Sequence, residues 1–188
     1  MLKDLVKKNR SFRRFYEDTP ISRRQLEELV DLARCTASGA NRQALRYVLS
    51  ADTALNEKIF PQLAWAGFFK DWDGPEKGER PAGYIILVQQ ESFKAMPVDT
   101  GIAAQTILLG AAEAGFGGCM LANIQREKLK TVLKLPADTE ILLVIALGKP
   151  REKVVLEEIP ADGDTKYYRD ADGTHHVPKH RLEDIILS

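Results

Sequence analysis

The sequence has few cysteines and no excess of charge of either sign. Its 188 residues include two cysteines, Cys35 and Cys119, which form no C-x-x-C pair and provide no zinc-ligand spacing. Two isolated cysteines are most simply interpreted as free thiols in a reducing compartment, so we expect a cytoplasmic protein. The 27 basic residues balance the 27 acidic ones, so the chain has no overall attraction to nucleic acid or to an anionic membrane. Anion binding would therefore require a local cluster of basic side chains.

Long apolar runs are absent as well. The longest, residues 141–147, is far too short to span a bilayer, and the first residues lack the apolar centre of a secretory signal peptide. No internal repeat, low-complexity tract or linker divides the sequence, and its length is sufficient to bury one core. We therefore expect one soluble domain spanning residues 1–188, with neither a membrane nor a nucleic acid as its partner.

Motifs of a self-contained active site are also missing. The sequence contains no G-x-S-x-G motif, no nucleophile triad and no conspicuous pair of carboxylates. His176 and His180 are four residues apart, but Pro178 between them argues against the helix that would direct both to one metal ion. We expect no metal site. An enzyme without its own acid, base, nucleophile or metal usually depends on an organic cofactor.

Apolar periodicity predicts an α+β fold in which helices pack against a sheet. Ser22 and Gln25 form a capping box that begins the second helix. The predicted helices span residues 2–9, 22–38, 98–115 and 126–133, and the predicted strands span residues 45–50, 82–89, 117–122 and 141–147, with an edge strand over 153–159.

Two further segments affect the expected assembly. The helix over 98–115, with Asp99 at its start and Gly115 at its end, is apolar around most of its circumference. Such a helix is buried on several sides, and a second subunit could cover one of them. Residues 71–81 are polar and rich in turn formers, as in a long surface loop at the rim of a site.

The first segment with ligand-binding potential is Arg10-Ser11-Phe12-Arg13-Arg14. Guanidinium groups and a hydroxyl are suitable donors for a phosphate group. A solvated basic turn is the ordinary alternative. A nucleic-acid patch is disfavoured because the chain is neutral and has a single cluster of this kind.

Two more segments are rich in small residues. Asn41 and Gln43, within residues 37–43, offer donors and acceptors, although a helix end followed by a polar loop is the simpler interpretation. The glycines of residues 115–119 follow a helix and precede a strand. A dinucleotide-binding fingerprint has the opposite order, so we exclude a Rossmann site. Cys119 has no evident base beside it and is expected to be buried and inert.

Taken together, these segments resemble the nitroreductase family of flavoproteins, in order and over nearly the whole chain. Family members carry an R-S-x-R segment before an aromatic, a P-S-x-x-N-x-Q-P-W segment, a G-x-G-x-C segment, an L-G-x-P segment and a basic P-K-x-R tail. The corresponding parts of this chain are residues 10–15, 37–45, 115–119, 147–150 and 178–181. One such match is weak evidence, whereas five in register are strong.

The chain departs from the family pattern at three places. Asn9 stands where many members have a second basic residue, Ala44-Leu45 replaces a Pro-Trp pair, and Met120 stands where tryptophan is frequent. These departures weaken inference about the substrate more than inference about the cofactor.

The resemblance implies a nitroreductase-like fold: a central, mostly antiparallel sheet flanked by helices, in an intertwined homodimer joined through the long helix and exchanged termini. It implies FMN at the subunit interface. The N-terminal segment and the basic tail would hold its phosphate and ribityl chain, the loop after the second helix would come from the other subunit, and backbone at the end of the 117–122 strand would lie beside the isoalloxazine ring. The implied cofactor-binding residues are Arg10, Ser11, Phe12, Arg13, Ser38, Gly39, Asn41, Leu121, Ala122, Asn123, Lys179 and Arg181.

The resemblance also implies a ping-pong oxidoreductase. NADH or NADPH would reduce the flavin and leave, and a nitroaromatic, a quinone or a similar small molecule would then accept the electrons in the same pocket. No side chain would be catalytic in its own right, because FMN carries the chemistry. Trp65, Phe68, Phe69 and residues 71–81 would border the acceptor, or the aromatics would pack in the core or at an interface. The alternatives are a flavin-binding sensor or storage protein and a relative that destroys flavin or dehalogenates its substrate.

Overall fold

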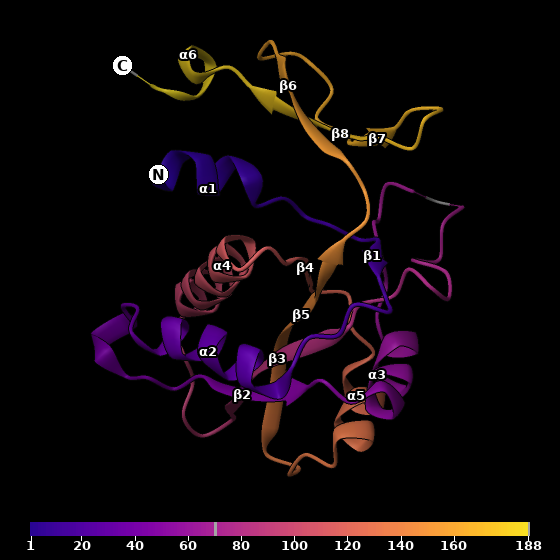
Figure 1. The fold of residues 1–188 in the computed structure, drawn as a ribbon. Helices are drawn as coiled ribbons and strands as arrows, with labels where there is room; N and C mark the ends of the chain where they lie inside the picture. The colour runs from indigo at the N-terminus through magenta and orange to yellow at the C-terminus, as the bar shows by residue number, and fades with distance from the viewer. Residues whose placement is uncertain (70, 188) are drawn as a thin grey trace.

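A five-stranded antiparallel sheet forms the centre of the molecule in the computed structural model, which describes residues 1–69 and 71–187. The longest strand, β5, pairs with β1, β3 and β4, and β3 also pairs with β2 (Figure 1). The strands are β1 (Phe15–Tyr16), β2 (Arg46–Ser50), β3 (Gly83–Gln90), β4 (Gly117–Leu121) and β5 (Thr139–Pro150).

Helices cover both faces of this sheet (Figure 1). Helices α2 (Arg23–Arg34) and α4 (Pro97–Glu113) bury one core against it, and α3 (Thr53–Ile59) and α5 (Arg126–Leu133) bury a second core on the opposite face. Alternate side chains of a strand point to opposite faces. Accordingly, Ile85 of β3 joins the first core and Ile86 joins the second. The sheet is therefore buried on both sides, which explains the unbroken apolar run of β3.

A second, three-stranded sheet is formed by the last part of the chain. Strand β6 (Val154–Ile159) pairs in parallel with β8 (His175–His180), which pairs antiparallel with β7 (Tyr168–Arg169). This sheet, the first helix α1 (Leu2–Lys8) and the last helix α6 (Leu182–Ile185) lie at one end of the molecule (Figure 1). The two termini are thus neighbours in space.

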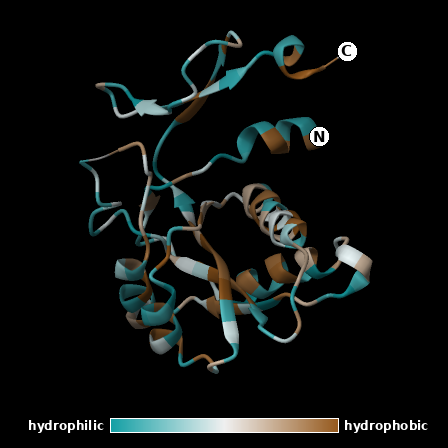
Figure 2. Ribbon diagram, turned by 180° about the vertical axis from the view of Figure 1, so that it is seen from behind, coloured by the Kyte–Doolittle hydropathy of each residue, from teal (hydrophilic) through white to brown (hydrophobic). Residues whose placement is uncertain are grey.

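Hydrophobic residues gather on the central strands and on the helix surfaces that face them (Figure 2). The outer surfaces of α3 and α5 are mainly hydrophilic, whereas the two chain ends carry exposed apolar side chains (Figure 2). Within residues 1–69 and 71–187, no helix combines the length and apolar character that crossing a bilayer requires.

The sequence correctly predicted the central antiparallel sheet and its flanking helices. The capping box is also confirmed, since the Gln25 backbone N–H donates to Ser22 Oγ over 3.2 Å and the Ser22 N–H donates to Gln25 Oε1 over 2.8 Å. Gly115 ends α4 with a φ of +80°, a backbone conformation that glycine adopts without strain.

Four details differ from the prediction. Helix α2 ends at Arg34 rather than Ser38, because the chain turns where the Thr36 hydroxyl donates to the Ala33 carbonyl over 2.7 Å. Helix α3, which begins at the N-cap Asp52, was not predicted. Asp99 lies in the first turn of α4 rather than at its cap, which is Met96. The predicted edge strand over 153–159 joins the C-terminal sheet instead of the central one.

Candidate functional site

A cavity of about 380 Å³ lies where the two ends of the chain meet. Its walls come from the segment after α1, from one face of α4, from β4 and from the C-terminal sheet. Four of the predicted cofactor-binding residues, Arg10, Ser11, Arg13 and Lys179, line it. The full lining is Asn9, Arg10, Ser11, Arg13, Gln105, Leu108, Met120, Tyr167, His175, Val177 and Lys179.

The glycine-rich strand β4 holds the N-terminal segment in place. Ser11 forms a parallel bridge with Gly118, and the Phe12 N–H donates to the Gly118 carbonyl over 3.0 Å. A Cβ atom at Gly118 would lie 2.2 Å from the Ala146 carbonyl oxygen, and one at Gly117 would lie 2.5 Å from the Phe12 ring. Gly117 therefore allows the Phe12 ring to pack closely on β4, and Gly118 allows β4 to lie close to the backbone of β5.

Arg10 and Arg13 present hydrogen-bond donors to the cavity. Arg10 Nη2 donates to the Val6 carbonyl over 2.8 Å, while the buried Arg10 Nε has no partner among the described residues. The Arg13 guanidinium lies over the Tyr167 ring, 4.8 Å from its centroid. Burial lowers the pKa of Arg10, but an arginine in a protein keeps its charge. The unpaired Nε of Arg10, the two guanidinium groups of Arg10 and Arg13 and the Ser11 hydroxyl together fit a phosphate group.

The tail contributes one face of strand β8. His175, Val177 and Lys179 are two residues apart and line the cavity, as expected for side chains on the same side of a strand. Pro178 is buried within the strand. Arg181 follows β8 and does not line the cavity of this chain. The basic P-K-x-R segment thus brings its lysine, rather than its arginine, to the N-terminal cluster.

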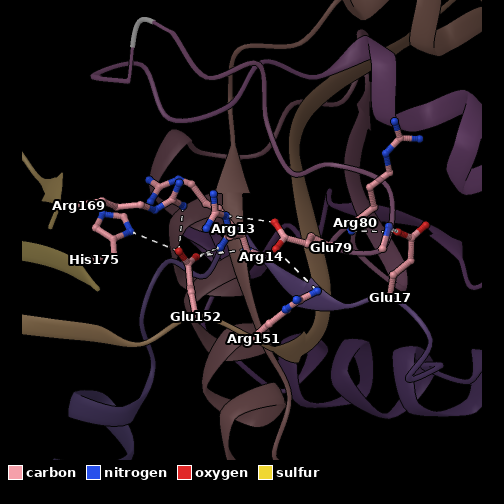
Figure 3. Close-up of polar contacts among 10 residues, drawn as sticks. Arg13, Arg14, Glu17, Glu79, Arg80, Arg151, Glu152, Arg169 and His175 are labelled. Carbon is pink, nitrogen blue, oxygen red and sulfur yellow. Dashed lines mark hydrogen bonds and ion pairs between the residues drawn. The ribbon is translucent and has the colours of Figure 1, made fainter. Parts of the chain in front are cut away.

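Glu152 ties the N-terminal segment to the tail (Figure 3). Its side chain is 2% exposed and accepts hydrogen bonds from the backbone N–H groups of Arg13 and Arg14 and, over 2.9 Å, from Arg169 Nη2. Nothing in the local sequence around Glu152 indicated this role. The carboxylate fixes the position of Arg13 at the cavity and compensates the charge of Arg169.

Glu79 fastens the polar loop over 71–81 to the same segment (Figure 3). Its carboxylate lies 3.2 Å from Arg14 Nε and 3.7 Å from Arg151 Nη1, and its carbonyl accepts from the Phe15 N–H over 3.0 Å. This loop is therefore anchored at its C-terminal end by the basic segment.

The aromatic residues before this loop divide between core and site. Trp65 is buried and contacts Phe60 in a tilted arrangement with ring centroids 5.7 Å apart. Phe68 is 53% exposed, and both Phe68 and Phe69 contact the ring of Tyr167, with centroids 4.9 and 5.2 Å away. Trp65 thus packs in the core, whereas the two phenylalanines lie behind a residue of the cavity wall.

The loop over 37–43 lies apart from the cavity of its own chain. The Gly39 N–H donates over 2.8 Å to Asp99 Oδ1 at the start of α4, and Ser38 Oγ accepts from the Gln43 N–H over 3.1 Å. Asn41 is exposed with a φ of +51°. Ser38, Gly39 and Asn41 are held together by these contacts, and their predicted role in a second subunit stays a prediction.

The end of β4 lies on the side of the sheet that carries α5. Leu121 is buried in the second core, and Ala122 and Asn123 are exposed. The Asn123 carbonyl accepts from the Ala64 N–H over 3.0 Å, and the Ala122 carbonyl accepts from Arg126 Nη2 over 3.2 Å. The predicted contact of this backbone with a flavin ring also stays a prediction.

Comparison with protein families identifies the family to which the fold belongs. The model of the nitroreductase family matches residues 6–149, which include the basic N-terminal segment and all of the central sheet except its last residue, Pro150. The chain belongs to the nitroreductase family. An oxygen-insensitive NADPH nitroreductase from Salmonella typhimurium is 28% identical over 173 residues, covering 85% of this chain and 70% of the relative.

Solved structures of this family have the same fold. A nitroreductase family protein from Streptococcus pneumoniae matches with a TM-score of 0.72 at 14% identity and covers all of both chains. An FMN-dependent nitroreductase from Clostridium difficile matches with a TM-score of 0.63 at 20% identity, covering 89% of this chain and 92% of the other. The first of these matches extends over the C-terminal part of this chain, which the family model leaves out.

The nitroreductase motifs did not indicate several residues of the cavity. Asn9, which departs from the family pattern, is 6% exposed and lines the cavity with a buried Oδ1 that has no partner among the described residues. Tyr167 and His175 come from the tail. Burial lowers the pKa of His175 to about 4, as does the positive charge of Arg13, so its ring is neutral at pH 7.

Proposed function

We propose that FMN occupies the cavity between the chain ends and passes electrons from NADH or NADPH to a small acceptor in a ping-pong cycle. Membership of the nitroreductase family makes the protein an NAD(P)H-dependent oxidoreductase that uses FMN. The observation that carries the placement is the convergence of Arg10, Ser11, Arg13 and Lys179 on one cavity. These residues lie at opposite ends of the sequence.

Each of these side chains has a role in binding. The guanidinium groups of Arg10 and Arg13 would form charge-assisted hydrogen bonds to the phosphate and the adjacent chain, and the Lys179 ammonium would add a third positive charge. The Ser11 hydroxyl can donate or accept along the same groove. Bound FMN supplies the hydride and electron chemistry, which this protein lacks in its own side chains.

The walls of the cavity restrict access to the bound cofactor. Leu108 and Met120 provide apolar surface, and Tyr167 closes the tail side while stacking on Arg13. The acceptor is proposed to be a nitroaromatic, a quinone or a similar flat molecule.

We propose a homodimer, and two features of the single chain support it. Exposed apolar residues lie at both chain ends, among them Leu2, Val6, Leu182 and Ile185, and such residues mark protein contacts. The loop over 37–43 does not line the cavity of its own chain, so the role proposed for it in FMN binding would be fulfilled in a neighbouring subunit.

The test begins with the colour of the purified protein. The protein is expected to carry FMN, to lose its flavin absorbance when NADH or NADPH is added without oxygen, and to recover it when a quinone or nitroaromatic is supplied. Parallel lines in double-reciprocal plots would support the ping-pong order. Failure to take up FMN on reconstitution would reject the proposed function.

The alternatives give different results in the same experiment. A sensor or storage protein would bind FMN, but neither nucleotide would bleach it. A flavin-destroying relative would convert the FMN to a new product detectable by mass spectrometry, and a dehalogenating one would release halide from a halogenated acceptor.

A further inference from the structure

His175 is a buried histidine with an unmet capacity for hydrogen bonding. Its side chain is 1% exposed, and neither Nδ1 nor Nε2 has a partner among the described residues. Buried polar atoms in native proteins are nearly always paired. Because His175 also lines the cavity between the chain ends, its missing partner is expected to be a ligand of that cavity.

The surroundings of the ring indicate which nitrogen carries the proton and which one has a free lone pair. The ring contacts Phe69 and Tyr167, with centroids 5.6 and 5.2 Å away, and neither ring offers a strong acceptor from its face. Glu152 Oε2 lies 3.9 Å from Nδ1, beyond hydrogen-bond distance, and already accepts from Arg169 Nη2. A nearby carboxylate favours the tautomer with its proton on Nδ1. Nε2 then carries a lone pair.

We propose that His175 Nε2 accepts a hydrogen bond from a hydroxyl of the ribityl chain of bound FMN. This inference rests on the proposed function, which places FMN in the cavity. A lone pair on Nε2 would repel phosphate oxygens, which are served by Arg10 and Lys179, but it matches a hydroxyl donor. The burial of the ring and the charge of Arg13 keep the imidazole unprotonated and preserve this acceptor.

His176 provides a matched control. It is the next residue of β8, and its side chain points away from the cavity. Its Nδ1 pairs with Glu157, its Nε2 lies 2.9 Å from Asp170 Oδ2, and its ring stacks on Tyr168 with centroids 4.7 Å apart. Replacing His176 therefore perturbs the same strand without removing a group from the cavity.

The experiment compares FMN binding with the stability of the FMN-free protein. The His175→Phe variant keeps a ring but loses the acceptor, and we expect its dissociation constant for FMN, from fluorescence titration of the apoprotein, to rise about tenfold. The melting temperature of the same apoprotein should stay equal or rise, because an unpaired polar ring is replaced by an apolar one. His175→Gln, whose amide oxygen can accept, should recover part of the affinity, and His176→Phe should bind FMN like the wild type.

Several outcomes would overturn the inference. Wild-type FMN affinity in the His175→Phe variant would show that His175 makes no hydrogen bond to FMN. A lowered melting temperature with unchanged affinity would show that the role of His175 is purely structural. Two-bond ¹H–¹⁵N NMR spectra of the wild-type apoprotein give an independent test that needs no variant: a ring protonated on Nε2 would exclude the acceptor role. If the wild-type apoprotein itself takes up no FMN, the proposed function fails before His175 is tested.

Discussion

Arg13 combines two roles that depend on different parts of the same residue. Its backbone N–H donates to Glu152, which fixes the segment, and its guanidinium lies over the Tyr167 ring at the cavity. A substitution of the side chain leaves the backbone contact intact. The variant can therefore separate ligand binding from folding.

We predict that Arg13→Ala weakens FMN binding by roughly 1.5–3 kcal/mol, the contribution of a hydrogen bond to a charged group. Fluorescence titration of the apoprotein measures this change. Arg24→Ala serves as the control, because Arg24 is 87% exposed and pairs with Glu28 on α2, away from the cavity. Equal affinities of the two variants would place the phosphate site elsewhere.

The two adjacent histidines of β8 should change stability with pH in opposite directions. The folded-state pKa of His175 is lowered to about 4 by burial and by the charges of Arg13 and Arg169, against the opposing effect of Glu152. Hydrogen bonds to Asp170 and Glu157 raise the pKa of His176. A histidine whose pKa is lowered in the folded state makes the protein less stable once the pH is low enough for the unfolded chain to bind the proton. A histidine whose pKa is raised in the folded state makes the protein more stable, fully so below the pKa of the unfolded chain.

For His175, the unfolded ring binds a proton as the pH falls through about 6.5, while the folded ring binds none until about 4. Stability is therefore lost across that window. We predict that the stability of the His175→Phe apoprotein relative to wild type increases as the pH is lowered from 7 to 4.5 in urea unfolding. For His176→Phe, the relative stability should decrease over the same range. A pH-independent difference for His175→Phe would show that the folded ring titrates normally.

At the scale of elements, α2 is the helix whose start is best defined by local sequence. Both hydrogen bonds of its capping box involve Ser22, and the helix packs its apolar face against α4. We predict that Ser22→Ala lowers the free energy of unfolding by about 1 kcal/mol, measured by urea titration, with FMN affinity unchanged. Ser92→Ala is the control, because Ser92 lies in an exposed turn. Equal stability of the two variants would show that the Ser22 cap does not stabilise the protein.

The elements that the sequence predicted most clearly are those with long apolar patterns. Helix α4 and strands β3 and β5 bury continuous apolar faces, so their composition alone identifies them. Helix α3 has seven residues and one buried side chain, Ile59, which gives too little pattern to detect. In the C-terminal sheet, the sequence predicted strand β6 but missed β7 and β8, which are short or alternate polar and partly buried residues and lie beside the ion pair of Glu152 with Arg169.

The same reasoning separates the predicted and the unpredicted site residues. Arg10, Ser11, Arg13 and Lys179 lie in short motifs that can be recognised locally, and the fold brings them together. The contact between Glu152 and Arg13 joins residues 139 positions apart. No periodicity or spacing records such a pairing, because it depends on how β5 carries the chain from the central sheet to the tail.

At the scale of the whole molecule, both ends of the chain lie on the same side of the protein (Figure 1), and residues near both ends line the cavity. The basic residues that line the cavity come from one chain, whereas the loop over 37–43 is fastened to the start of α4 through Asp99. If the proposed homodimer is correct, each site combines the Arg13 side of one subunit with the Asn41 side of the other. A mixture of two variants can test this arrangement, whereas a single variant cannot.

Two variants, Arg13→Ala and Asn41→Ala, should each bind FMN weakly, and a mixture of the two subunits should restore tight binding. In a mixed dimer of twofold symmetry, one site would combine both substitutions and the other would have neither, so random pairing restores about one quarter of all sites. The two variants are unfolded and refolded together, and FMN is then added at a concentration that fills only wild-type sites. The bound FMN measures the restored fraction, and each variant refolded alone is the control. If Arg13 and Asn41 of one chain contributed to the same site, every site in the mixture would carry one of the two substitutions, and no tight binding would return. Exchange of subunits can bring a wild-type Arg13 and a wild-type Asn41 together only when the two residues of a site come from different subunits.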